Sequence, residues 1–497
     1  MKRITTTLAL LALCFQLLFS QYSSSKPDLP ASFFKERREA LRKLMPDNSV
    51  FVLFAYPVRN YSADNDYPYH PNPDLYYFSG YSEPGALMFI FREAQTFKGI
   101  DNPVSEMLFV PATNPNAEKW TGKKMSYKQV MEELGIQYAT EAGKFKSFPV
   151  DFQNYKIIVL DILQTDVRDA SSSQSDLFDL IKQFREKADI QKSPTAMSIM
   201  LNGFAIQRND PAQKKLIDSL LNEHINYLLF ERYTSQLRSV KTPEELAVLQ
   251  KAIDVSCEGH NEAMRAMRPD MSERELQAIH EFKHKKGGAE GEGYAPIVAA
   301  GNNGCVLHYE SNNAEHLGNN LVVMDVGAEY HGYSADVTRT APANGKFSPE
   351  QLVIYNIVLA AHDSAIIAIK SGIPYHELEK IGQRVIANGL IKLGLIKKKS
   401  EVSTYYPHGI SHPIGLDVHD KFIMGQDLQK NMVITIEPGI YISEGSNCDK
   451  KWWGIGVRIE DDVLVLDDRG DVLSKASPVK PGEIEKLMKE KSIFKPK

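Results

Sequence analysis

A stretch of thirteen residues, 408–420, constrains this chain more than any other part of its sequence. It reads HGISHPIGLDVHD and carries three histidines: His408, His412 and His419. Its glycines and its proline argue against a helix, because glycine is flexible and proline lacks the amide hydrogen that a helix interior requires. We therefore expect a looped segment that gathers imidazoles in one place.

Two pairs of acidic residues flank this stretch along the chain. Asp325 and Asp336 precede it, and Glu437 and Glu460 follow it. Residues 321–340 read as a hairpin that turns near 331–334, so Asp325 and Asp336 are expected to face each other across two strands. Two carboxylates held that close repel each other and take up a proton. A divalent cation between them is the simplest way to keep both ionised.

The two glutamates lie in or beside runs rich in β-branched residues, 433–437 and 457–461. Burying a glutamate on a central strand is costly unless the carboxylate is paired. Taken alone, each glutamate is also explained as a surface residue of an edge strand or as a partner of Arg458. The four carboxylates and the histidines together favour a site for a pair of hard or borderline divalent ions.

The composition of this donor set limits the metal and the chemistry. Oxygen-rich sites with a single histidine suit manganese, cobalt or iron better than a structural zinc, which prefers cysteine and histidine. Two ions that share a water lower its pKa and polarise a carbonyl group at the same time. Hydrolysis of an amide or ester is therefore the expected reaction class.

The 497 residues are enough for several domains. Residues 29–235 alternate short apolar runs with helical stretches and predict an α/β domain. A boundary is expected near 236–241, and residues 236–497 read as an α+β domain with antiparallel strands and helices packed on one side. Thr242 and Ser348 are each followed by proline and, two residues further on, by Glu or Gln, which predicts a capped helix start at both.

The first 21 residues read as a secretory signal peptide, in which a basic start precedes an apolar run at 8–19. That run is too short to span a bilayer comfortably. A lipid anchor on Cys14 is disfavoured, because Leu13 stands where a small residue is wanted. No later segment is expected to cross a membrane, and the net charge of -5 argues against nucleic-acid binding. We expect an exported protein, periplasmic or secreted.

The motifs carry a resemblance to a known family. Residues 408–420 fit, at every position, the proline-peptidase motif of the pita-bread metallopeptidases, in the branch of aminopeptidase P and prolidase. The similarity covers about residues 32–490 and includes, in order, NGCVLHY at 303–309, DVG at 325–327, DVTRT at 336–340, TIEPGIY at 435–441 and GVRIED at 456–461. Residues 62–69 and 74–80 resemble the family's creatinase-like, non-catalytic domain. The resemblance thus implies a creatinase-like domain at 29–235 and a pita-bread catalytic domain at 236–497.

The resemblance also implies a metal-binding role for five residues. Asp325 would bind the first ion, and Asp336 and Glu460 would bridge both ions. His412 and Glu437 would complete the coordination of the second ion. A bridging hydroxide would lie near Asp325 and Glu437, with Glu437 as the general base.

Four further residues receive roles from the resemblance. His308 and His419 would hydrogen-bond the scissile carbonyl or the substrate backbone, and His408 would line the pocket for a proline ring. Arg458 lies two residues before a metal ligand and would orient it. A purely structural reading, in which the histidines are hydrogen-bonded loop residues, stays open.

The implied function is an Xaa-Pro aminopeptidase that acts on peptides with proline at the second position. Its implied cofactors are two divalent ions, Mn²⁺ in preference to Co²⁺, Fe²⁺ or Zn²⁺. The alternatives are a prolidase that cuts only Xaa-Pro dipeptides, a non-catalytic peptide-binding relative, and creatinase-like amidine hydrolysis. A homodimer or homotetramer is expected, and Trp120 resembles a position that reaches a neighbouring subunit in this family.

Overall fold

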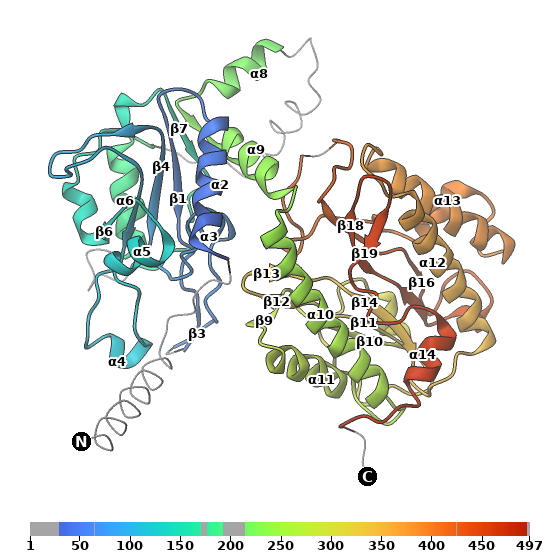
Figure 1. The fold of residues 1–497 in the computed structure, drawn as a ribbon. Helices are drawn as coiled ribbons and strands as arrows, with labels where there is room; N and C mark the ends of the chain where they lie inside the picture. The colour runs from blue at the N-terminus through green and yellow to red at the C-terminus, as the bar shows by residue number, and fades with distance from the viewer. Residues whose placement is uncertain (1–28, 64, 170–175, 192–213, 424, 495–497) are drawn as a thin grey trace, which may run out of the picture. The chain divides into compact units, whose positions relative to one another are not determined.

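The computed structural model of the chain describes residues 29–63, 65–169, 176–191, 214–423 and 425–494. The expected leader lies outside these residues. The chain divides into two compact units, Met1–Tyr233 and Thr234–Lys497. The first unit is an α/β domain and the second an α+β domain, which confirms both expected classes (Figure 1).

The first unit is built on a mixed sheet whose strand order is β6-β5-β4-β1-β7-β8. Strand β1 pairs antiparallel with β4 and parallel with β7. The sheet strands are β1 (Ser49–Phe54), β4 (Leu87–Gln95), β5 (Val104–Val110), β6 (Tyr138–Glu141), β7 (Ile157–Leu160) and β8 (Ile225–Asn226), beside a small pair, β2 (Asn60–Ser62) and β3 (Asn65–Asp66). The helices are α2 (Ala31–Leu44), α3 (Pro73–Ser79), α4 (Glu118–Thr121), α5 (Tyr127–Leu134), α6 (Leu177–Lys187), α8 (Lys214–Leu221) and α9 (Tyr227–Arg238), the last of which runs into the second unit.

Helices cover both faces of this sheet, which is why β1 is buried along its whole length. On one face Phe89 packs near Phe184 of α6, with ring centroids 6.4 Å apart. On the other face Phe51 meets Phe78 of α3 at 5.6 Å and Phe230 of α9 at 4.8 Å. Figure 1 shows the sheet between these two groups of helices.

The second unit consists of several small antiparallel sheets with long helices around them. Its strands are β9 (Gly291–Glu292), β10 (Ile297–Ala300), β11 (Leu321–Asp325), β12 (Ala328–Tyr330), β13 (Tyr333–Ser334), β14 (Thr338–Pro342), β15 (Val433–Ile436), β16 (Gly439–Ile442), β17 (Ile455–Arg458), β18 (Asp461–Val465) and β19 (Gly470–Val472). Its helices are α10 (Pro243–Ala266), α11 (Glu273–Lys286), α12 (Pro349–Ala368), α13 (His376–Lys392) and α14 (Pro481–Leu487).

The two helix starts expected from the sequence are confirmed in atomic detail. The Thr242 hydroxyl accepts from the amide of Glu245, whose side chain accepts in return from the Thr242 amide, and proline follows the cap. Ser348 and Gln351 form the same reciprocal pair at the start of α12. These caps satisfy amide hydrogens that would otherwise have no partner at the start of a helix.

Two local expectations differ from the structure. In the hairpin of β11 and β14, Asp325 pairs with Thr338, and Asp336 lies just before β14 rather than directly opposite Asp325. The intervening residues form a second hairpin, β12 and β13, that joins a different sheet. The β-branched run 457–461 is not one strand, because it is broken at Glu460 between the end of β17 and the start of β18, which belong to separate sheets.

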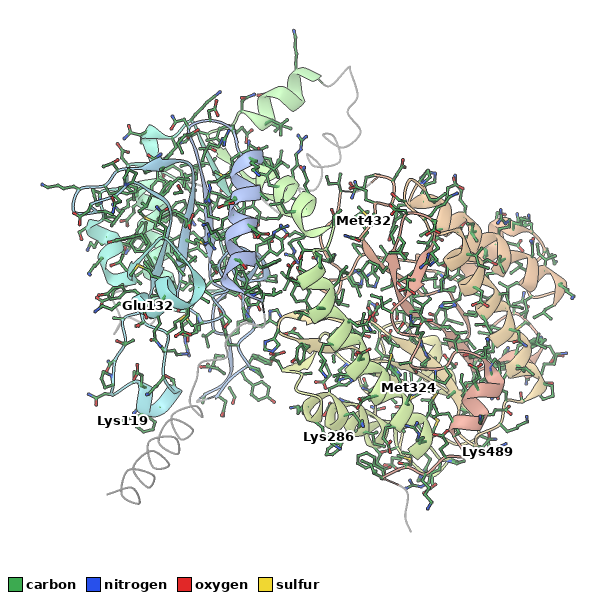
Figure 2. The ribbon with its side chains drawn as sticks, in the orientation of Figure 1. Lys119, Glu132, Lys286, Met324, Met432 and Lys489 are labelled. Carbon is green, nitrogen blue, oxygen red and sulfur yellow. The ribbon has the colours of Figure 1, made fainter. Side chains whose placement is uncertain are left out.

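The core of the second unit lies beneath the long helices. Met324, one residue before the end of β11, is fully buried inside this unit, whereas Lys286 and Lys489 lie on its surface (Figure 2). Among the described residues, helix α12 is long and apolar enough to cross a membrane by length and composition. One such helix is weak evidence of a membrane span, because a core helix passes the same test, and the α12 side chains Ile354 and Val358 pack into this core.

Three histidines are buried together in the second unit. His260 of α10 lies 4.6 Å, ring to ring, from His280 of α11, and His280 lies 6.1 Å from His284. His260 hydrogen-bonds the Val326 carbonyl over 3.1 Å, Nδ1 of His284 lies 3.5 Å from Oε1 of Glu292, and both ring nitrogens of His280 are buried without a hydrogen-bond partner among the described residues.

Candidate metal centre

Asp325 and Asp336 meet at the hydroxyl of Tyr294. The Tyr294 oxygen lies 2.6 Å from Oδ1 of Asp325 and 2.6 Å from Oδ1 of Asp336. The single hydrogen of this phenol thus faces one oxygen of each carboxyl group. Asp325 and Asp336 are close together, as the sequence predicted, although a tyrosine rather than direct pairing across two strands joins them.

Glu437 and Glu460 occupy corresponding places, each at a break between two strands. Glu437 follows β15 and donates its amide to the Ile410 carbonyl at 2.8 Å. Glu460 follows β17, and its Oε2 accepts from the Thr338 hydroxyl at 2.7 Å. A strand break leaves the side chain free of the alternating pleat, so each carboxylate can turn toward the same centre as the aspartates.

A buried arginine fixes the break that carries Glu460. Arg339 donates to the Glu460 carbonyl at 2.6 Å and to Oδ1 of Asp461 at 2.7 Å. Its side chain is fully buried, and such charge-assisted bonds are the strong ones. These bonds fix the backbone at Glu460 and thereby the position from which its carboxylate extends.

His412 completes the group from the looped segment before β15. Its Nε2 lies 3.3 Å from Oδ2 of Asp336, 3.6 Å from Oε1 of Glu437 and 4.0 Å from Oε1 of Glu460. The backbone of His412 is tied to Thr435 of β15 by two hydrogen bonds of 2.8 and 3.0 Å. One ligand atom from each of Asp336, His412 and Glu460 lies within 4.8 Å of the others, as a shared ion requires.

The protonation of the carboxyl groups reflects their crowding. Burial raises the pKa of Asp336, Glu437 and Glu460 well above the ordinary carboxyl value, and neighbouring carboxylates raise it further. Burial also opposes ionisation of Asp325, but the Arg458 guanidinium and the Tyr294 hydroxyl outweigh it and lower the pKa of Asp325. Asp325 is thus the carboxyl group of this centre whose ionised form is favoured.

This donor set fits divalent cations. Three buried carboxyl groups that hold protons against their ordinary pKa would give them up to a cation, which relieves their mutual repulsion. Four carboxylates with one imidazole match the preference of Mn²⁺ and similar ions for oxygen ligands. The predicted ligands Asp325, Asp336, His412, Glu437 and Glu460 are thus all gathered at one place by the fold.

Comparison with known proteins places this geometry in a family. Residues 247–467 match the model of metallopeptidase family M24, and residues 34–156 match that of the aminopeptidase P N-terminal domain. The Xaa-Pro aminopeptidase of Escherichia coli K12 is 31% identical over 467 residues, which span 92% of this chain and 97% of that protein. The chain belongs to the aminopeptidase P family.

Solved structures of aminopeptidase P agree with the fold. The structure of E. coli aminopeptidase P with the inhibitor Pro-Leu superposes with a TM-score of 0.76 at 29% identity, covering 93% of this chain and 98% of that one. Aminopeptidase PepP of Pseudomonas aeruginosa matches with the same TM-score at 31% identity, over 93% of this chain and 98% of that one. The aminopeptidase P architecture therefore extends over both units.

The flanking histidines of the aminopeptidase P motif surround the acidic centre. The His419 ring stacks on His412 with centroids 4.0 Å apart, and Nδ1 of His408 lies 3.6 Å from Oε2 of Glu437. Burial lowers the pKa of His408 and of His419 to about 4, helped by Arg458 for His408 and by His412 for His419. His308 is exposed and lies near enough to influence both rings. At neutral pH His408 and His419 are therefore uncharged.

Arg458 connects the centre to a second tyrosine. Its Nη2 and Nε donate to Oδ2 of Asp325 at 2.6 and 3.1 Å, and its Nη1 donates to the Tyr441 hydroxyl at 2.9 Å. The Tyr441 oxygen also lies 2.7 Å from Nε2 of His408. Arg458 was expected to orient Glu460, the ligand two residues after it. In the structure its guanidinium instead donates to the carboxylate of Asp325.

Sequence reasoning missed two tyrosines of this aminopeptidase P site. Tyr441 lies inside the matched segment TIEPGIY, which is the signal that would have singled it out. Tyr294 lies in a loop beside β9, outside the motifs that carried the resemblance, and no spacing in the sequence connects it to Asp325 and Asp336.

Proposed function

We propose that this chain is an Xaa-Pro aminopeptidase that removes the first residue from peptides whose second residue is proline. The observation that carries the proposal is the convergence of Asp336, His412 and Glu460 in a chain that aligns with E. coli Xaa-Pro aminopeptidase over nearly its whole length. A family resemblance alone would not require the ligand side chains to meet, and here they do.

In this proposal Asp325, Asp336, His412, Glu437 and Glu460 hold two divalent ions. When bound, the ions supply Lewis acidity and lower the pKa of water. Glu437 accepts the proton of the attacking water, because its partly buried carboxylate lies beside the other ligands. Arg458 keeps Asp325 ionised and oriented through its fork of hydrogen bonds.

The uncharged histidines serve the substrate. A neutral imidazole can donate one N–H to a carbonyl oxygen, and in this proposal His419 binds the scissile carbonyl or the neighbouring peptide backbone together with His308. His408, between Tyr406 and Tyr441 at ring distances of 5.1 and 5.4 Å, offers an aromatic wall for a proline ring. Because an Xaa-Pro bond has no N–H, recognition of the ring must replace the backbone contact that other peptidases use.

The test is a cleavage assay with Mn²⁺, an Xaa-Pro-Pro tripeptide and an Xaa-Pro dipeptide in parallel. We expect release of the first residue of the tripeptide by the leader-free protein and loss of that activity in Glu437→Gln. The exposed Glu377 on α13 provides the matched control, Glu377→Gln, which should keep full activity. Absence of turnover with metal bound would favour the non-catalytic reading.

The assay also separates the main alternative. A prolidase would cut the dipeptide and leave the tripeptide intact. Turnover of the dipeptide alone would show that the chain acts as a prolidase.

Manganese is our choice of ion, on the strength of the oxygen-rich donor set. Activity reconstituted with Mn²⁺, Co²⁺, Fe²⁺ and Zn²⁺ in separate metal-free samples ranks the ions. Greater activity with Zn²⁺ than with Mn²⁺ would contradict this choice.

Export and self-association complete the proposal. Residues 1–21 support export, and N-terminal sequencing of protein from the periplasm or medium tests it, with an intact first residue as the contrary result.

A homodimer or homotetramer is supported by Trp120, whose side chain on α4 is 90% exposed. Light scattering of wild type and Trp120→Ala tests the assembly, and a monomeric wild type would refute it.

A further inference from the structure

The segment 412–420, here called the histidine loop, is closed on itself. The Asp420 amide donates to the Pro413 carbonyl at 2.9 Å, and the Gly415 amide donates to the Asp417 carbonyl at 3.1 Å. This closure brings the two ends of the loop together. It is how His419 comes to stack on His412, seven positions earlier in the chain, at a ring distance of 4.0 Å.

A buried group of charges lies at the base of the histidine loop. Asp420 accepts from Nζ of Lys241 at 2.9 Å, from Nη2 of Arg238 and from the Lys421 amide at 2.8 Å. The side chains of Asp420, Arg238 and Lys241 are only 1–2% exposed. Arg238 also donates to Asp417, whose side chain is 42% exposed. The described residues thus place two cations around one fully buried carboxylate.

The backbone of the loop packs directly on these charges. A Cβ atom at Gly415 would lie 2.1 Å from Oδ2 of Asp420 and 3.0 Å from Cε of Lys241, so only glycine fits there. On its other side the loop is tied to the strands, because the Ser334 amide donates to the Gly415 carbonyl at 2.8 Å and the Ile414 amide to the Val433 carbonyl at 3.1 Å. The end of the loop that bears His419 is held by Asp420.

A buried ion group is a poor source of stability, because the cost of removing charges from water offsets most of their attraction. Its use is more often to specify one arrangement. In this loop the residue next to Asp420 is His419, whose ring stacks on His412.

We propose that Asp420, held by Arg238 and Lys241, is a positioning residue that sets the His419 imidazole in place for the substrate. The inference rests on the proposed function, in which His419 binds the substrate. Asp420 itself does not touch the substrate in this account. It acts only through His419, and this restriction is what an experiment can test.

The experiment is a double-mutant cycle on Xaa-Pro-Pro cleavage by the full-length, metal-loaded protein. A displacement of about 1 Å in a positioned group can cost on the order of a hundredfold in rate, so Asp420→Asn is expected to lower kcat by about tenfold to a hundredfold. In a His419→Ala background the same change is expected to cost less than about threefold, because the group it positions is gone. An equal loss in both backgrounds would overturn the inference.

Matched variants separate positioning from folding. Asp417→Asn changes the half-exposed carboxylate of the same loop and is expected to stay within about threefold of wild type. Lys241→Met removes one donor and leaves Arg238, and Lys241→Arg is expected to restore most of the activity lost in Lys241→Met. If Asp420→Asn does not fold, the cycle is carried out with Lys241→Met and His419→Ala, with the same two outcomes.

A crystal structure of the Asp420→Asn or Lys241→Met protein gives a readout that needs no turnover. We expect the His419 ring to leave its stacked position on His412 while the strands around it stay in place. An unmoved ring would refute the positioning role. A wild-type protein that does not cleave the tripeptide would instead refute the proposed function, so the two failures are distinguishable.

Discussion

Metal binding to this site should release protons, and the structure indicates how many. Asp336, Glu437 and Glu460 have pKa values raised by burial and by their neighbours, and each must lose its hydrogen to become a ligand. We therefore expect about one to three protons to be released per chain.

The sign and size of the pH dependence follow from this count. A proton that must leave before a ligand binds weakens metal binding as the pH falls. Each released proton raises the metal Kd about tenfold, or about 1.4 kcal/mol, for every unit of pH decrease. Metal affinity should thus rise from pH 6 to pH 8, with a slope that reports the number of protons.

The assay is isothermal titration of the metal-free protein with Mn²⁺ in two buffers of different ionisation enthalpy at the same pH. The difference in apparent enthalpy gives the number of protons directly. Glu437→Gln removes one of the three carboxyl groups and should lower the count by up to one, whereas Glu377→Gln on the surface should not change it. A Kd independent of pH, with no proton released, would refute the reasoning from burial and repulsion.

Three further predictions concern single side chains. Tyr294→Phe removes the hydroxyl between the two aspartates and should weaken Mn²⁺ binding about tenfold to a hundredfold in the same titration, and an unchanged Kd would contradict the bridging role. Arg458→Lys cannot reproduce the fork of hydrogen bonds and should lower kcat by at least about tenfold at saturating metal, and an unaltered kcat would contradict it. Burial lowers the pKa of His280 well below its ordinary value. Below about pH 6.5 the unfolded chain therefore takes up a proton at this residue that the folded chain does not. The free energy of unfolding decreases by about 1.4 kcal/mol for each unit by which the pH is lowered in that range. Denaturant unfolding between pH 7 and 5 should show a shallower loss for His280→Leu than for wild type or for the exposed-site control His376→Leu, and parallel losses would refute the assignment.

Local chemistry made much of the fold predictable from the sequence. The helix starts at Thr242 and Ser348 depend on side chains three residues apart, so the sequence contains everything needed to recognise them. The strand at β1 was readable because both of its faces are buried and its sequence is a continuous apolar run.

The parts that were not predictable depend on contacts between distant residues. The break at Glu460 interrupts a run of β-branched residues, and it is held by Arg339 and Thr338, more than 100 residues earlier in sequence. The pairing of Asp420 with Lys241 spans 179 residues, and neither residue is unusual in its own neighbourhood. The ligand residues were found because they lie in recognisable motifs, whereas Tyr294 lies in none.

The central claim is that Asp325, Asp336, His412, Glu437 and Glu460 hold the ions that drive cleavage before proline. The most direct test titrates metal-free protein with Mn²⁺, counts bound ions, and follows release of the first residue from Xaa-Pro-Pro and Xaa-Ala-Pro side by side. We predict that activity rises until about two ions are bound per chain and that only the proline peptide is cleaved. Full activity without bound metal, or equal cleavage of the alanine peptide, would contradict the account.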